Sequence, residues 1–179
     1  AESTDAEERK NYYDIVEANN ERLLQLINEI LDLSKIEAGM VEFTIAPMRL
    51  HLLCNEIYNA LKFRCPMGVE LVYEASDEDI VIEGDKNRIF QVVSNLIGNA
   101  FKSRRKGNEI EFHVSDTGIG IEADKLSKVF ERFVKVNNFA QGTGLGLSIC
   151  KTIIERLGGT ISVSSEMGKG TTFLFTLPL

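Results

Sequence analysis

The chain has 179 residues, 44% of them hydrophobic, which is enough for one compact domain and an appended element but not for two large domains. The net charge of −7 provides no broad attraction for nucleic acid or anionic lipid, so both are disfavoured as partners. No apolar run approaches the roughly 20 residues that span a bilayer. Three scattered cysteines, none in a C-x-x-C pair, indicate neither a disulfide framework nor a zinc site. We expect a soluble protein in a reducing, cytoplasmic setting.

Residues 8–38 are predicted to form one long helix. Its apolar residues recur at alternating spacings of three and four, and they cover a stripe wider than a two-helix seam: Leu23, Leu24, Leu26, Ile27, Ile30, Leu31 and Leu33. Gly39 stands where a helix C-cap glycine belongs. The pattern is typical of a bundle helix, and the alternative is a helix packed only on its own domain. We therefore place the domain boundary at residue 39.

After Gly39 the pattern changes to alternation, which predicts a strand through Val41, Phe43 and Ile45. A helix is expected over 49–64, stopped by Pro66, and two strand-like runs follow over 69–74 and 80–83.

The remaining elements are predicted to begin with a helix that Asp85 caps and that runs to about Lys102. The spacing that follows leaves room for one strand, near 110–114, before a loop and a short helix over 126–133. A helix then opens at the glycines of 142–146 and runs to 157, and a hairpin pairs 160–165 with 171–177. Strands and helices alternate without a regular βαβ repeat, which favours an α/β (α+β) fold, a two-layer sandwich with a mixed sheet.

Three segments carry chemistry. The helix after Asp85 presents one polar stripe that ends in Asn95, Asn99 and Lys102. Amide oxygens suit a hard cation and an ammonium suits a phosphate, although such a stripe is also what a solvated helix face looks like.

The second segment, DTGIG at 116–120, follows an alternating strand. Asp116 can accept a hydrogen bond from an exocyclic amine such as that of adenine, or it can simply be the residue of an Asp-Gly turn.

The third segment is GTGLGL at residues 142–147, which opens a helix. Successive backbone N–H groups at a helix N-terminus bind anions, so this segment predicts a phosphate-binding loop. Its G-x-G-x-G spacing lacks the last glycine of the dinucleotide fingerprint and the Gly-Lys-Ser/Thr end of a P-loop. Rossmann dehydrogenases and P-loop NTPases are therefore disfavoured.

These segments resemble, in order, the N, G1, F and G2 boxes of sensor histidine kinases: NLIGNAFK (95–102), DTGIG (116–120), FERF (130–133) and GTGLGL (142–147). Residues 31–39 resemble the end of that family's second dimerisation helix, and residues 168–173 resemble its last adenine-pocket segment. The resemblance therefore covers essentially the whole chain. It implies the Bergerat ATP-binding fold over 40–179 and, over 1–39, the second dimerisation helix without the His-bearing first helix.

The resemblance also implies the roles of individual residues. Asn99 would coordinate Mg²⁺, and Asn95 and Lys102 would contact the phosphates of ATP; these three residues are the implied catalytic set. Asp116 would bind the adenine amine, with Gly118 and Gly120 shaping its pocket. The other cofactor-binding positions are Phe133 of the F box, the six residues Gly142, Thr143, Gly144, Leu145, Gly146 and Leu147, and Thr171.

Position 95 distinguishes branches of this superfamily. Its ATPases typically carry there a Glu that activates water, whereas Asn95 cannot act as a general base at neutral pH. The site is therefore expected to align the nucleotide and leave the γ-phosphoryl for an incoming imidazole.

Two departures from the family pattern qualify this picture. The phosphoacceptor motif is absent, so the chain by itself is not expected to autophosphorylate, and His51 and His113 are interpreted as ordinary histidines. The spacing from Lys102 to Asp116 is also about ten residues shorter than is usual in the family, through a deletion or through residues that are not part of the sequence.

The leading hypothesis is the catalytic module of a sensor histidine kinase, which uses Mg-ATP to phosphorylate a His on a dimerisation domain. Its expected partners are a second copy, through the dimerisation helices, and the receiver domain of a response regulator. The resemblance leaves a membrane-anchored parent protein open. The alternatives are a nucleotide-binding signalling module without its own phosphoacceptor and an ATP-hydrolysing conformational machine.

Overall fold

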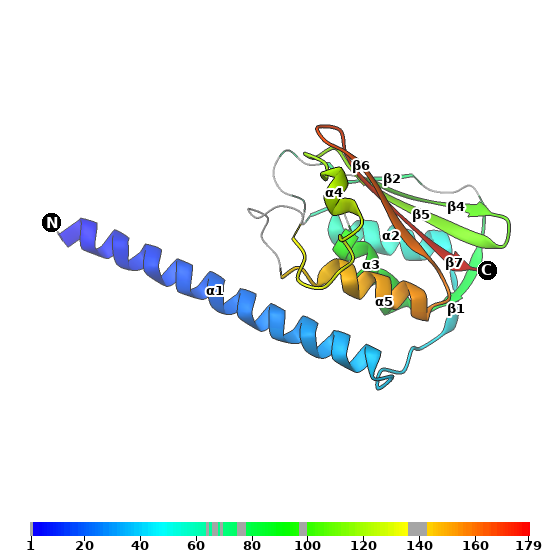
Figure 1. The fold of residues 1–179 in the computed structure, drawn as a ribbon, viewed down its shortest axis with the longest axis horizontal. Helices are drawn as coiled ribbons and strands as arrows, with labels where there is room; N and C mark the ends of the chain where they lie inside the picture. Colours follow the sequence, from blue (N-terminus) through cyan, green and yellow to red (C-terminus); the bar gives the residue numbers. More distant parts are fainter. Residues whose placement is uncertain are drawn as a thin grey trace.

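The structure is a computed structural model that describes residues 2–63, 65, 68, 70–74, 78–96, 100–135 and 143–179, with the side chains of 2–7, 100 and 101 left out. One long helix, α1 (Glu2–Glu37), precedes and extends away from an α/β sandwich (Figure 1). The helix ends as predicted at Gly39, which has φ +68°. The N–H of Met40 donates to the carbonyl of Lys35 at 2.9 Å, the bond that closes a Schellman cap.

The sandwich has one layer of sheet and one layer of helices, with a small two-stranded sheet beside them. The helices are α2 (Leu50–Leu61), α3 (Lys86–Leu96) and α5 (Gly146–Arg156), with a short α4 (Ala123–Leu126). The strands are β1 (Ala46–Arg49), β2 (Val72–Glu74), β3 (Val81–Gly84), β4 (Ala100–Lys106), β5 (Glu109–Asp116), β6 (Ile161–Glu166) and β7 (Gly170–Pro178).

The main sheet is mixed, as predicted. Its strand order is β2-β4-β5-β7-β6, with β2 and β4 parallel and the other pairs antiparallel, while β1 pairs antiparallel with β3. Helices α2, α3 and α5 lie over one face of this sheet (Figure 1). The core lies between the two layers and includes the stacked rings of Phe112 and Phe175, whose centroids are 4.5 Å apart.

The predicted strand over 41–45 is wrong, since the ladder begins only at Ala46. The N–H of Thr44 donates at 2.9 Å to the carboxylate of Asp85, and the N–H of Ile45 bonds the carbonyl of Phe43 at 3.1 Å. One donor is thus used by a distant carboxylate and the other by a neighbouring carbonyl, so this segment does not pair as a strand. The same Asp85 caps α3 as predicted, accepting the N–H of Asn87 at 2.9 Å.

The helix expected to reach Lys102 ends earlier, because α3 stops at Leu96 and residues 100–106 form β4. The single strand expected in this region is therefore two strands joined at Gly107. Within β4 the Ser103 side chain is buried, while Lys102 and Arg104 face away from the helices. β4 pairs with β2 on one side and with β5 on the other. The stability that this pairing provides exceeds the preference for a helix in the local sequence pattern. The short helix expected over 126–133 is likewise displaced, since α4 covers 123–126.

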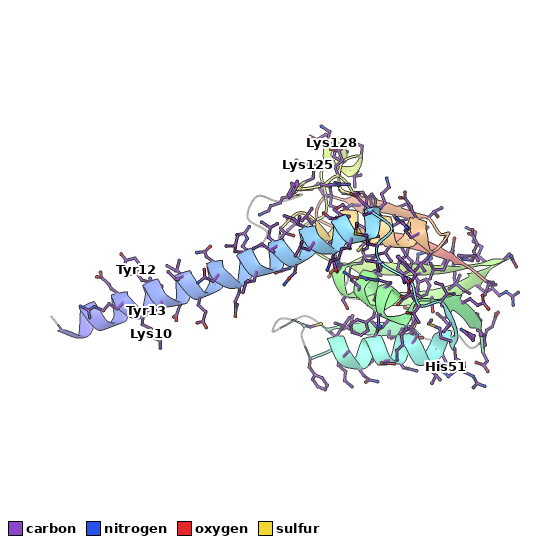
Figure 2. The ribbon with its side chains drawn as sticks, turned by 90° about the horizontal axis from the view of Figure 1, so that it is seen from below. Lys10, Tyr12, Tyr13, His51, Lys125 and Lys128 are labelled. Carbon is purple, nitrogen blue, oxygen red and sulfur yellow. The ribbon has the colours of Figure 1, made fainter. Side chains whose placement is uncertain are left out.

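The last turns of α1 dock on the sandwich. Leu33 and Ile36 are buried, and Arg156 of α5 donates to the carbonyl of Ile36 at 2.6 Å. The earlier part of the apolar stripe is exposed, with Leu24 at 61%. Figure 2 shows Tyr12 and Tyr13 on the part of α1 that extends beyond the sandwich. The end of the helix therefore packs on its own domain. Its remainder carries an uncovered apolar face, for which the bundle interpretation stays a prediction.

Candidate functional site: the end of strands β5 and β7

The site lies at the end of β5, on the face of the sheet that carries the helices. Side chains alternate along β5, so that the even-numbered Phe112 and Val114 point to the core, and Asp116 continues this row. Its register partner on β7 is Thr171, in line with the buried Phe173. Asp116 and Thr171 therefore stand side by side at the end of two central strands, facing the helical layer.

Asp116 forms the turn that its sequence suggested. Its Oδ1 accepts the N–H of Gly118 at 2.8 Å, and a Cβ at residue 118 would lie 2.8 Å from that same oxygen. Among the described residues, no hydrogen bond to Oδ2 is found. Asp116 can therefore be both a turn residue, through Oδ1, and a ligand acceptor, through Oδ2.

The G1 loop is held against the turn between β6 and β7. Gly120 has φ +76°, and a Cβ there would lie 2.3 Å from the carbonyl oxygen of Glu166. The N–H of Gly168 donates to the carbonyl of Ile119 at 2.8 Å. Gly170 approaches the backbone of Asp116 so closely that a Cβ would lie 1.9 Å from its carbonyl oxygen. These glycines are required because two backbones touch where the pocket is formed.

The F box is joined to both neighbouring motifs. Phe130 packs edge-on against Phe173 of β7, with ring centroids 6.3 Å apart. The N–H of Phe133 donates to the carbonyl of Gly144 at 2.9 Å. Phe133 is the one described non-glycine residue with a positive φ, +62°, and its side chain is 61% exposed. A strained backbone of this kind persists where surrounding contacts fix it, and it is typical of functional loops.

The G2 box opens α5 as predicted. Leu145 is buried at the N-cap, its carbonyl accepts the N–H of Ile149 at 2.9 Å, and Gly144 has φ +79°. Gly146 faces the N box, because a Cβ there would lie 3.7 Å from Nδ2 of Asn95. Thr143 donates from its hydroxyl to the carboxylate of Glu29 on α1.

Asn95 lies on the last turn of α3, exposed, beside α5. The Cys150 thiol lies beneath it, and burial raises the pKa of this thiol to about 12, partly offset by a hydrogen bond from the Asn95 side chain. At this pKa the thiol stays protonated and has no nucleophilic role at neutral pH. The N and G2 boxes are thus in contact through Asn95.

The site residues divide into three groups. The structure joins Asn95, Gly118, Gly120, Phe133, Asp116, Thr171 and residues 143–147 through the chain of contacts just described. Asn99 and Gly142 lie outside the described residues. Lys102 is in β4 opposite His113, on the sheet face away from the helices, and its ammonium lies 3.5 Å from the Glu74 carboxylate. The structure thus does not bring Lys102 to the site, and its phosphate contact stays a prediction.

One participant was not found from the sequence. Ser165 on β6 is the register partner of Thr171, and its hydroxyl contacts both Thr171 and the G1 loop. It stands in a run of small polar residues whose pattern is that of an ordinary strand, so only the register between strands could reveal it.

Among the described residues, no group of three or more His, Cys, Asp or Glu side chains is arranged to hold a metal ion. The described site instead contains a carboxylate acceptor at Asp116 and the backbone N–H groups that begin α5. Groups of these two kinds bind base amines and phosphates, respectively. Asn95 adds a neutral amide beside that helix terminus.

Comparison with known proteins agrees with this geometry. Residues 84–179 match the family described as histidine kinase-, DNA gyrase B-, and HSP90-like ATPase, and residues 1–39 match the His Kinase A (phospho-acceptor) domain. The first match covers more than half of the chain. The chain therefore belongs to this ATPase family, as a sensor histidine kinase whose ATP-binding catalytic domain follows a dimerisation region.

Individual relatives are similar over nearly the whole chain. The autoinducer 2 sensor kinase/phosphatase LuxQ of Vibrio parahaemolyticus is 38% identical over 99% of this chain, which corresponds to 23% of LuxQ. The chain thus spans about a quarter of the length of this curated relative. The alignment extends over 200 positions against 179 residues, so LuxQ carries residues that have no counterpart here.

Two solved structures share the fold. ShkA, whose full-length crystal structure is in complex with AMPPNP, superposes with a TM-score of 0.82 at 26% identity over 96% of this chain and 39% of ShkA. The histidine kinase ThkA, in complex with the response regulator protein TrrA, gives a TM-score of 0.73 at 28% identity over 93% of this chain and 50% of ThkA. The fold and the family thus agree with the resemblance found in the four boxes.

Proposed function

We propose that residues 40–179 bind Mg-ATP and align its γ-phosphoryl group for transfer to a histidine on a dimerisation domain, and that residues 1–39 are the second helix of that domain. The observation that carries this proposal is the unbroken series of contacts among the boxes. Asn95 meets Gly146, Gly144 meets Phe133, and the F box meets β7, whose Thr171 is paired with Asp116 of β5. These contacts support one binding site that the four boxes share.

Within this pocket each residue has one task. Asp116 accepts the hydrogen bond of the adenine amine, and the N–H groups that begin α5 hold phosphate oxygens. Asn95 orients the phosphate end without removing a proton from water, because an amide is not a base at neutral pH. Slow hydrolysis follows, which favours a kinase over an ATP-hydrolysing conformational machine.

We assign Mg²⁺ to Asn99. An amide oxygen is a neutral ligand, so we infer that the phosphates and water supply most of the coordination and that protein and ion bind each other weakly without nucleotide. The ion would neutralise phosphate charge as the phosphoryl group departs.

The phosphate loop lies against the proposed dimerisation helix. Thr143 hydrogen-bonds to Glu29, and Arg132 of the F box pairs with Glu37 of the same helix. A phosphoryl group held by this loop is therefore close to α1, the helix that would pack beside the acceptor helix. The position of the phosphate loop beside α1 supports transfer of the phosphoryl group to a histidine of the helical bundle. It argues against a nucleotide that is bound only as a structural ligand.

We place the acceptor histidine on a helix other than α1, since residues 1–39 contain none. His51 begins α2 on the outer surface, where Figure 2 labels it, 3.5 Å from the Asp79 carboxylate. His113 lies on the sheet face away from the helices, beside Glu111. Neither position faces the pocket.

We further propose that the chain dimerises through its α1 stripe and passes the phosphoryl group to the receiver domain of a response regulator, as the ThkA–TrrA complex suggests for a relative. Within the described residues, no helix is long and apolar enough to cross a membrane. We propose a cytoplasmic location for this part of the protein.

The test is reconstitution. The chain is mixed with a separately produced dimerisation domain that bears a histidine, radiolabelled ATP and Mg²⁺, and acid-labile phosphate on that domain is measured. The kinase proposal predicts label that requires Mg²⁺ and disappears in Asp116→Asn. Nucleotide binding without label would favour a signalling module, and rapid release of free phosphate would favour an ATPase.

A further inference from the structure

The polar side chains of Asp116, Thr171 and Ser165 form one row across the sheet, at the end that carries the proposed nucleotide site. Thr171 of β7 is paired with Asp116 of β5 on one side and with Ser165 of β6 on the other. All three continue the strand positions that face the helices, because Val114, Phe173 and Val163 precede or follow them two residues away in the same row. Ser165 is thus a neighbour of the adenine-binding pair that contacts the ligand only through Thr171.

The hydroxyl of Ser165 uses its full hydrogen-bonding capacity. It accepts the N–H of Ile121 at 2.8 Å, it lies 2.8 Å from the carbonyl oxygen of Gly170, and it lies 3.0 Å from the hydroxyl of Thr171. A serine hydroxyl has one proton to donate and two lone pairs that accept. Ser165 meets all three partners at once.

These contacts fix the direction of the Thr171 proton. A carbonyl oxygen cannot donate, so the Ser165 proton must go to Gly170. The 3.0 Å contact between the two hydroxyls is then a hydrogen bond only if Thr171 donates to Ser165. Thr171 is only 6% exposed, so its hydroxyl has few alternative partners in solvent. Its oxygen therefore retains lone pairs but no proton for a ligand beside Asp116.

We propose that Ser165 is a positioning and specificity-determining residue of the nucleotide site. By taking the Thr171 proton, it makes Thr171 an acceptor like Asp116, so that the end of β5 and β7 accepts an exocyclic amine and rejects a carbonyl. Adenine presents an amine at this position and guanine a carbonyl oxygen. The same hydroxyl also accepts the N–H of Ile121, which joins the end of the G1 loop to the β6–β7 hairpin. This inference rests on the proposed ATP site.

The experiment compares Ser165→Ala with Ser164→Ala in the whole chain. Ser164 is the preceding residue of the same strand, exposed on the opposite sheet face, and serves as the matched control. Calorimetry measures the Kd for Mg-ATP and for Mg-GTP, and a thermal scan measures the unfolding midpoint. We expect Ser165→Ala to weaken ATP binding about 5- to 20-fold and GTP binding much less, since the freed Thr171 proton can now point at a carbonyl. The ATP-to-GTP preference should fall about 3- to 20-fold, and Ser164→Ala should leave both constants unchanged.

Ser165→Thr keeps a hydroxyl on a strand that tolerates β-branched residues, and it should restore the preference. An equal loss of ATP and GTP affinity in Ser165→Ala would reduce Ser165 to a structural residue and overturn the inference, as would failure of a folded Ser165→Thr to restore the preference. If Ser165→Ala does not fold, Thr171→Val decides: it keeps the bonds from Ser165 to Ile121 and Gly170, and an unchanged preference would overturn the inference.

Different outcomes would contradict the proposed adenine site and the proposed role of Ser165. If the unaltered chain binds ATP no better than GTP, the proposed adenine site itself is wrong. If it prefers ATP and Ser165→Ala keeps that preference, the site stands and only the role of Ser165 is lost.

Discussion

Replacing Asp116 with Asn separates a turn residue from a nucleotide ligand. In the structure Oδ1 of Asp116 accepts the N–H of Gly118 at 2.8 Å. Asn presents a carbonyl oxygen in the same place and favours the same turn, so the loop should keep its shape. We expect the free energy of unfolding to change by about 0.5 kcal/mol or less, which is a shift of roughly 1–2 °C in Tm for a chain of this size.

The affinity for ATP should change far more than the free energy of unfolding. In the proposed complex, Oδ2 of Asp116 accepts a hydrogen bond from the adenine amine. In Asp116→Asn the side-chain NH2 group takes the place of Oδ2, so that two hydrogen-bond donors face each other. Losing a charge-assisted hydrogen bond and leaving buried donors facing each other should cost about 2–4 kcal/mol, or roughly 30- to 1000-fold in Kd. The assay is calorimetric titration with Mg-ATP, paired with a thermal scan of each protein.

Asp124→Asn is the matched control, since Asp124 is an exposed carboxylate in the first turn of α4. It removes the same charge near the same loop and should leave the Kd within about 2-fold, because an exposed charge is screened by solvent. Asp116 would be a turn residue alone if Asp116→Asn bound ATP like the unaltered chain. The reasoning would equally be refuted if binding were lost together with the fold.

Four further outcomes are expected. Gly144→Ala, at φ +79° with its Cβ 2.8 Å from the backbone of Phe133, should lower both Tm and ATP affinity in thermal and calorimetric measurements, the affinity at least about 10-fold. Lys102→Ala tests the phosphate contact that the resemblance implies: the exposed ion pair on the other sheet face predicts ATP affinity within about 3-fold of the unaltered chain, and a loss above about 10-fold would support the phosphate contact instead. Hydrogen bonds from Lys106 and Arg104 lower the pKa of Glu111 to about 2, so it stabilises the fold above its unfolded pKa of about 4.3, and this stabilisation disappears as the pH falls toward 2. Denaturant titrations across that window should therefore show a weaker pH dependence for Glu111→Gln, and an identical dependence would contradict the assignment. Leu24→Glu, in the exposed stripe of α1, should abolish concentration-dependent self-association in sedimentation, and a strictly monomeric unaltered chain would count against the bundle.

The sequence alone determined the features that depend on local chemistry. Gly39 and Asp85 were identified as caps because a left-handed glycine and a side-chain acceptor at a helix start each have a local signature. The family followed from four ordered boxes, since glycines at close backbone contacts and an acid at a strand end are needed wherever this site is built. The mixed two-layer sandwich followed from the irregular alternation of helical and strand patterns.

Tertiary structure decided what local pattern could not. The sequence predicted a helix to about Lys102, but residues 100–106 pair with strands on both sides, and Lys102 therefore lies on the sheet face away from the helices. The segment 41–45 alternates like a strand, yet a distant carboxylate binds its backbone instead. Ser165 became part of the site only through its register with Thr171 and its bond to Ile121. Strand pairing and register join residues far apart in the chain, and their energies depend on partners that no local window of the sequence contains.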